Sequence, residues 1–151
     1  MDDPQIEPGG AADDGFVDRA VAAFWGLGIG DAYGRPLEFE RGDLVRSLPV
    51  DTRPGVFDWT DDTHMALYLA DAVLAQPPGP LDDDTLGKAV ADAFVRWRHD
   101  PKTPFTAPGG TCMAGVRSYE GSGDWRTAGV PHSDGCGAVM RIVPLVLAYR
   151  G

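Results

Sequence analysis

The sequence predicts an all-α fold in which long loops hold the chemically unusual residues. Several segments repeat apolar side chains at helical spacing, whereas no segment alternates apolar and polar side chains convincingly as a strand does. The chain has 151 residues, of which 43% are hydrophobic and 24% charged. This composition is typical of one globular domain with its own core.

The first 14 residues are polar and acidic, so we expect a disordered tail at 1–14 and a single domain at 15–151. The first helix should start after Asp13 or Asp14, because either side chain can cap a helix. Apolar spacing then predicts one buried face. Its members are Val17, Ala20, Val21, Phe24 and Gly28. Residues 34–58 are rich in Gly, Pro, Arg and Asp and predict an irregular loop with at most a short helix.

The second helix is expected to begin at Thr60. Only one charge interrupts the run MALYLADAVLA, so this helix should lie at the centre of a bundle, and the proline-rich residues 76–80 should end it. The third helix has the clearest periodicity, with acids at its start and bases at its end that complement the helix dipole. Its apolar face is Leu86, Ala89, Val90, Ala93, Phe94 and Trp97, and Pro101 should stop it.

The remaining residues predict two loops and two more helices. Residues 100–110 and 122–135 read as loops, and residues 111–121 as a short helix. We expect a last helix that contains Val139, Met140, Val143 and Leu147, kinked at Pro144. Loops of this length in a helical chain are more often functional than idle.

Charge and cysteine content exclude several classes of protein. There are 13 basic and 23 acidic residues, and the formal net charge is −10, which disfavours nucleic-acid binding by a basic face. Two cysteines, Cys112 and Cys136, are too few for a disulfide framework or a cysteine-rich zinc site. No long apolar run or signal peptide is visible. We therefore expect a cytoplasmic protein without a membrane anchor.

Three motifs could carry chemistry. The glycines between Gly26 and Gly30 do not indicate a dinucleotide site, because that fingerprint needs a preceding strand; close helix packing before a turn explains them. Thr60, Asp61 and Asp62 can cap a helix and complement its dipole, or they can form half of a Mg²⁺ shell.

The loop from Ser133 to Gly137 leads into the expected last helix, whose free N–H groups would favour an anion. An ordinary glycine-rich turn is the alternative. Cys136 resembles a nucleophile only superficially, since no His partner with an orienting Asn or Asp can be assigned to it. Glu38, in a Gly/Pro loop, matters only if the fold brings it to Thr60–Asp62.

The segments GDAYGRPLE, WTDDTHMAL, GGTC and SDGCGAVMRIVPL occur in this order along the chain. Together they resemble the ADP-ribosylglycohydrolase family, from about Phe16 to Leu147. The resemblance implies an all-α orthogonal multi-helix bundle. It also implies an enzyme that uses two Mg²⁺ ions, or Mn²⁺, to release ADP-ribose from a protein side chain or a small acceptor.

The resemblance assigns roles to individual residues. Thr60, Asp61 and Asp62 would bind metal, and Glu38 and Asp62 would be catalytic. Glu38 and the loop residues would bind substrate; those loop residues are Ser133, Asp134, Gly135, Cys136 and Gly137. Many family members have Asn at the position of Cys136.

Family members are considerably longer and draw further metal ligands from a C-terminal motif. We therefore expect this chain to be the N-terminal half of the family domain, with exposed apolar helix faces through which it could self-associate. An inactive member that binds ADP-ribose, or serves a structural or interaction role, is the alternative. The sequence leaves the acceptor open, whether arginine, serine or another group.

Overall fold

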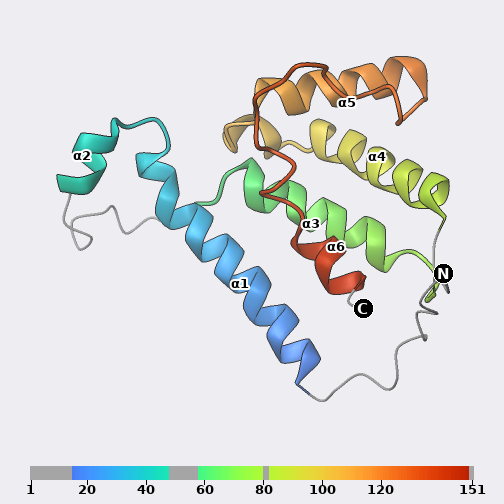
Figure 1. Ribbon diagram of the computed structural model, residues 1–151, viewed down its shortest axis with the longest axis horizontal. Helices are drawn as coiled ribbons and strands as arrows, with labels where there is room; N and C mark the ends of the chain where they lie inside the picture. Colours follow the sequence, from blue (N-terminus) through green and yellow to red (C-terminus); the bar gives the residue numbers. More distant parts are fainter. Residues whose placement is uncertain (1–14, 48–57, 80–81, 150–151) are drawn as a thin grey trace, which may run out of the picture.

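A computed structural model describes residues 15–47, 58–79 and 82–149 of the chain, and in these ranges it contains helices and no strands. The all-α prediction is thus confirmed. The helices, shown in Figure 1, are α1 (Phe16–Gly34), η1 (Arg35–Leu37), α2 (Gly42–Ser47), α3 (Asp61–Leu74), α4 (Asp83–His99), η3 (Thr103–Phe105), α5 (Gly110–Ser122) and α6 (Val143–Ala148). Helix α3 packs against both α4 and α6, and α5 packs against α4. None of these helices is long and apolar enough to cross a membrane.

Helix α3 starts at the capping residue that the sequence predicts, and α4 starts within the predicted run of acidic residues. The Thr60 side chain accepts a hydrogen bond from the backbone N–H of Asp62, 3.3 Å away. Asp82 accepts one from the backbone N–H of Thr85, at 2.9 Å. Each cap satisfies an amide that has no partner within its own helix.

The core forms between α3, α4 and α5. Trp97 of α4 is completely buried and packs with Met65 of α3 and Val116 of α5. Beside this core, the Tyr68 hydroxyl donates to the Asp100 carboxylate at 2.7 Å, and His64 Nε2 lies 3.5 Å from the same carboxylate. These contacts hold the middle of α3 against the end of α4.

The first helix differs from its prediction. Gly15 occupies the N-cap position and makes no side-chain cap; Asp13 and Asp14, and the predicted tail at 1–14, lie outside the described residues. The predicted buried face is only partly covered: Val17 and Val21 are exposed and the other three residues are half-buried. Ala32 is the only buried residue of α1. That face lines an open groove opposite α3 instead.

The glycine string lies inside α1 rather than before a turn. Only Gly28 among its three glycines comes close to another helix, because a Cβ there would lie 3.7 Å from Thr63 Cγ2, whereas nothing approaches Gly26 or Gly30. Close helix packing therefore explains one glycine of the three.

The C-terminal helix is shorter than predicted. Helix α6 begins at Val143, and Val139 and Met140 lie in the turns before it. Pro144 occupies its first turn, where a missing N–H costs no hydrogen bond, so it starts the helix and does not kink it. The other predictions are close to the structure. After α1 ends at Gly34, the described residues up to 58 contain the short helices η1 and α2. Helix α5 covers the residues of the predicted short helix, and the predicted loop at 100–110 contains η3.

The burial of Trp97 generates a stability prediction. Trp97→Ala should lower the free energy of unfolding by about 3–5 kcal/mol through loss of buried surface and creation of a cavity. Trp97→Phe should cost less than half as much, because the indole N–H has no hydrogen-bond partner among the described residues. Urea unfolding followed by circular dichroism measures both. If Trp97→Phe lowered the free energy of unfolding as much as Trp97→Ala does, the indole N–H group would have to make a hydrogen bond that the phenyl ring cannot replace.

Candidate functional site

A pocket of about 500 Å³ lies between α1, η1 and the start of α3. It brings together three of the predicted site residues, Glu38, Thr60 and Asp62, although 22 positions separate Glu38 from Thr60 in the sequence. Its other lining residues are Gly26, Leu27, Gly30, Asp31, Gly34 and Arg35. The fold therefore brings Glu38 to the same pocket as Thr60 and Asp62, as its predicted role in the site requires.

Asp31, to which the sequence assigns no role, holds this pocket together. Its carboxylate accepts hydrogen bonds from the backbone N–H and hydroxyl of Thr60, at 2.9 and 2.7 Å. It also accepts from the backbone N–H and hydroxyl of Thr63, at 3.1 and 2.6 Å. Asp31 thus caps α3 from a different helix and satisfies amides of its first turn. An acidic residue in an otherwise apolar stretch of α1 was the available signal.

Asp61 faces a different neighbour from Asp62. Only 5% of Asp61 is exposed, and its Oδ2 accepts from the backbone N–H of Gly109, the N-cap residue of α5, at 3.1 Å. Its own backbone N–H donates to the Thr106 carbonyl at 2.7 Å. Asp61 therefore joins the start of α3 to the start of α5, and it does not line the pocket that Asp62 lines.

The pocket concentrates negative charge. Burial, together with the carboxylates of Asp31, Asp61 and Glu38, raises the pKa of Asp62 to about 6, against an opposing effect of Arg141. Partial desolvation, Asp61 and Asp31 also raise the pKa of Glu38. Both carboxyl groups therefore hold protons more tightly than isolated carboxyl groups in water do, and both would be stabilised in their charged form by a cation.

Two arginines border this acidic cluster. The Arg35 guanidinium donates to the backbone carbonyls of Trp59 and Phe105, at 3.1 and 2.9 Å, and forms an ion pair of 2.6 Å with Asp58. Arg35 thereby links η1 to the residues just before α3 and to η3. The Arg141 guanidinium stacks over the Phe94 ring, with its Cζ 4.9 Å from the ring centroid, and contacts the sulfur of Cys112 at 3.2 Å.

The Ser133–Gly137 loop lies against the first turn of α5 and not in the pocket. The Ser133 hydroxyl donates to Thr111 Oγ1 at 3.3 Å, and a Cβ on Gly137 would lie 3.0 Å from Cys112 Sγ. The helix expected to follow this loop begins only at Val143, so the prediction of a helix N-terminus at the loop is wrong. Turns occupy the intervening residues.

The oxygen atoms that line the pocket are suited in part to binding a hard divalent cation. No hydrogen-bond donor among the described residues contacts the Asp62 or Glu38 carboxylate, and the Thr60 hydroxyl offers a further oxygen. Mg²⁺ prefers such oxygen ligands and keeps several waters. In the described ranges, however, no group of three or more His, Cys, Asp or Glu side chains is arranged to hold a metal ion. The described residues could therefore supply some of the oxygen ligands of such an ion, but they do not form a complete set.

Comparison with known proteins places these residues in a wider group. A family model described as ADP-ribosylglycohydrolase matches residues 12–151. The chain is 33% identical over 146 residues to ADP-ribosyl-[dinitrogen reductase] glycohydrolase of Rhodospirillum rubrum, covering 89% of this chain and 46% of the relative. It is 34% identical over 149 residues to an ADP-ribosylarginine hydrolase of Pseudomonas putida, covering 89% and 37%. The chain thus spans less than half the length of these relatives, and no solved structure matches it significantly.

Asp31→Asn should destabilise the chain by about 1–3 kcal/mol, because an amide offers fewer acceptor sites to the four donors of Thr60 and Thr63 and brings an N–H group to face them. Asp71→Asn, an exposed change on α3, is the matched control and should alter stability little. Thermal or urea unfolding of the three proteins tests this. An Asp31→Asn variant as stable as the control would remove the role assigned to Asp31.

The raised pKa of Asp62 predicts a dependence of stability on pH. Since this pKa rises from 3.8 in the unfolded chain to about 6 in the folded chain, the folded state binds the proton more tightly. The contribution of Asp62 to stability is therefore fully present at low pH and is lost as the pH rises toward about 6.

With EDTA present, Asp62→Asn should be more stable than the wild type at neutral pH by on the order of 1 kcal/mol, a value reduced for solvent screening of this partly exposed side chain. The difference should shrink as the pH falls and disappear below about pH 3, where both states of the wild type are protonated. Urea unfolding across this range measures it, and parallel pH profiles for the two proteins would contradict the assignment.

Proposed function

The chain belongs to the ADP-ribosylglycohydrolase family, and from that membership we propose that it contributes the acidic part of a Mg²⁺-dependent site that hydrolyses the bond between ADP-ribose and a protein side chain. The observation that carries the proposal is the meeting of Glu38, Thr60 and Asp62 in one pocket. Relatives from Pseudomonas putida and Serratia proteamaculans are named ADP-ribosylarginine hydrolases. We therefore favour the N-glycosidic bond to arginine as the bond that is cleaved.

We assign the metal to the Asp62 carboxylate and the Thr60 hydroxyl. Asp61 is the third proposed ligand, although it lies outside the pocket and its Oδ2 accepts from the Gly109 N–H, so only its other carboxylate oxygen is left for the cation. Asp31 supports this assignment, because it accepts the hydrogen bond of the Thr60 hydroxyl and so leaves a lone pair of that oxygen for a cation, the other accepting from the Asp62 N–H. When bound, Mg²⁺ would polarise the ribose hydroxyls and make a bound water more acidic. It would also offset the repulsion among the pocket carboxylates, which is the cause of part of the raised pKa of Asp62.

Hydrolysis needs one water and two proton movements. The water oxygen forms a bond to the anomeric carbon of ribose, the bond from that carbon to the acceptor nitrogen breaks, and the acceptor leaves with a proton. Glu38 suits the transfer of these protons because it is an exposed carboxylate at the pocket with a raised pKa. Asp62 would orient the attacking water from the pocket wall.

We propose that the Ser133–Gly137 loop binds the diphosphate and ribose of ADP-ribose. Its contact with the first turn of α5, whose N-cap residue Gly109 donates to Asp61, supports this assignment. A diphosphate on this loop would be repelled by the acidic residues at the start of α3, so a bound cation should favour substrate binding. Cys136 supplies a thiol where many members have an amide, which removes one hydrogen bond to the ligand.

The proposed setting is a cytoplasmic acidic protein whose partners are ADP-ribosylated proteins or small ADP-ribose conjugates, with no basic face for nucleic acid. A second candidate function is binding of ADP-ribose without turnover, or a structural role. One observation favours it: the described residues form no complete group of metal ligands. Metal affinity and turnover, measured on the same protein, separate the two functions.

Mn²⁺ should bind the chain, and Asp62→Asn should weaken that binding by at least about tenfold. Removing a residue that only supports a metal ligand typically costs about 10–100-fold in metal affinity, and removing the ligand itself should cost at least as much. Electron paramagnetic resonance of free Mn²⁺ measures the affinity, with Asp71→Asn as the control. Release of ADP-ribose from ADP-ribosylated arginine, assayed in parallel, should fall in both Asp62→Asn and Glu38→Gln. Only Asp62→Asn should alter Mn²⁺ binding strongly.

Equal Mn²⁺ affinity in the wild type and Asp62→Asn would refute the metal assignment and leave helix capping as the role of this motif. Metal binding without any release of ADP-ribose by the wild type would favour the second candidate function.

A further inference from the structure

The guanidinium of Arg141 has sulfur atoms as its hydrogen-bond acceptors among the described residues. Its Nη1 lies 3.0 Å from the Met65 sulfur and 3.2 Å from the Cys112 sulfur. The guanidinium also covers the Phe94 ring, with Cζ 4.9 Å from the ring centroid. Sulfur is a weak acceptor, so these contacts fix the position of the cation without neutralising it. Within the described ranges, Arg141 forms no ion pair with a carboxylate.

The second arginine near the site, Arg35, is held differently. It donates to two backbone carbonyls and pairs with Asp58, so oxygen atoms already surround its charge. Arg141 Nε and Nη2 have no acceptor in the part of the chain that the structure describes, and neither is one of the enclosed nitrogens that lack a partner. These two nitrogens therefore reach solvent and can donate to an anion.

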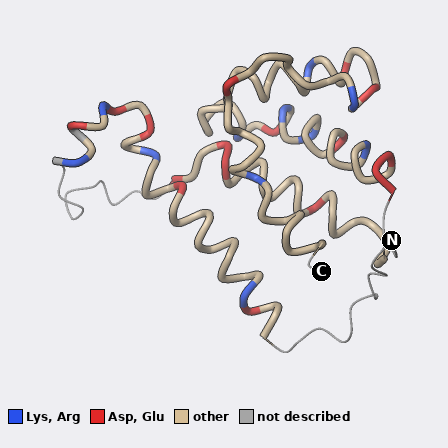
Figure 2. The backbone as a smooth tube through the Cα atoms, in the orientation of Figure 1, with Lys and Arg blue, Asp and Glu red and all other residues tan. Residues whose placement is uncertain are grey.

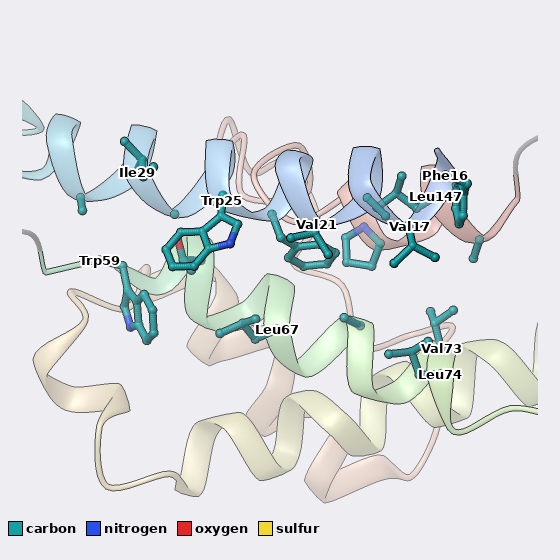
Figure 3. A pocket seen from close by; sticks show the side chains of 18 residues that line it. Phe16, Val17, Val21, Trp25, Ile29, Trp59, Leu67, Val73, Leu74 and Leu147 are labelled. Carbon is teal, nitrogen blue, oxygen red and sulfur yellow. The ribbon is translucent and has the colours of Figure 1, made fainter. Parts of the chain in front are cut away.

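Arg141 lies between the Ser133–Gly137 loop and the acidic start of α3. A Cβ on Gly137 would lie 3.8 Å from Arg141 Nη1. Burial raises the pKa of Asp61 and of Asp62, and Arg141 opposes that rise at both. Figure 2 shows acidic residues at the start of α3, so an anion that binds nearby needs a cation beside it. The open groove between α1 and α3 has no charged residue on its walls (Figure 3) and offers an anion no such partner.

From these contacts we propose that Arg141 binds the diphosphate of ADP-ribose beside the Ser133–Gly137 loop. The inference rests on the proposed function, because it adds a cation to the loop that we assign to the same diphosphate. Nε and Nη2 form one edge of the guanidinium, and together they can donate to two phosphate oxygens. The Phe94 ring and the two sulfurs hold this edge in place before the ligand arrives, which lowers the entropic cost of binding. A carboxylate in their place would compete with the ligand for the same cation.

Titration calorimetry with ADP-ribose and with inorganic pyrophosphate, both in EDTA, tests the proposal. Arg141→Met should weaken the binding of each by at least about tenfold, because hydrogen bonds to charged groups contribute strongly. Arg117→Met is the matched control: it removes the same charge from an exposed position on α5 and should change the affinity little. Raising NaCl should narrow the difference between the wild type and Arg141→Met, because salt screens an attraction that this variant lacks.

Stability separates a binding role from a structural one. The unfolding midpoint of Arg141→Met should stay close to that of Arg117→Met, because a thioether packs well against sulfur and aromatic groups. A further measurement keeps the side chain in place. The NMR signal of the Arg141 Nε–H group, assigned by its absence in Arg141→Lys, should shift when pyrophosphate is added to the wild type.

ADP-ribose binding that Arg141→Met retains would overturn this inference and leave the loop assignment standing. An Arg141 signal that pyrophosphate does not shift would have the same consequence, and a loss of affinity in Arg141→Met would then be structural. If the wild type bound neither ADP-ribose nor pyrophosphate, both this inference and the assignment of the loop would be wrong.

Discussion

The Asp31 carboxylate is the contact on which the arrangement of the site depends. It accepts hydrogen bonds from two backbone amides and two hydroxyls at the start of α3, and so fixes α1 relative to that helix. Charge-assisted bonds of this kind are among the stronger ones in proteins. Without them the two helices would share little surface near the pocket, because most of the α1 apolar face looks across the groove. Hydrogen bonds to one carboxylate therefore fix the relative position of these two helices, a role that apolar packing usually has between neighbouring helices.

The same region illustrates how a functional site can oppose stability. Burial raises the pKa of Glu38, Asp61 and Asp62, and the nearby Asp31 carboxylate raises the pKa of each further, with Arg141 opposing this at Asp61 and Asp62. A protein selected only for stability would place amides or apolar groups there. The buried Trp97 core between α3, α4 and α5 supplies packing free energy that offsets this repulsion.

Sequence reasoning succeeded where local chemistry decides the structure. Thr60 and Asp82 mark the helix starts because a cap needs only its own backbone neighbours, and the face of α4 follows from spacing. It was wrong where tertiary placement decides. The α1 face has the pattern of a buried face but lines an open groove, and Pro144 starts a helix instead of bending one. Asp31 could not be recognised as a cap because its partners lie 29 and 32 positions further along the chain.

Thr63 connects two parts of the molecule that otherwise have little in common. Its side chain lines the open groove, and its hydroxyl donates to Asp31. The groove between α1 and α3 and the carboxylate pocket therefore meet at one residue. A substitution of Thr63 would alter both surfaces at once, because it would change the groove wall and remove a hydrogen bond to Asp31.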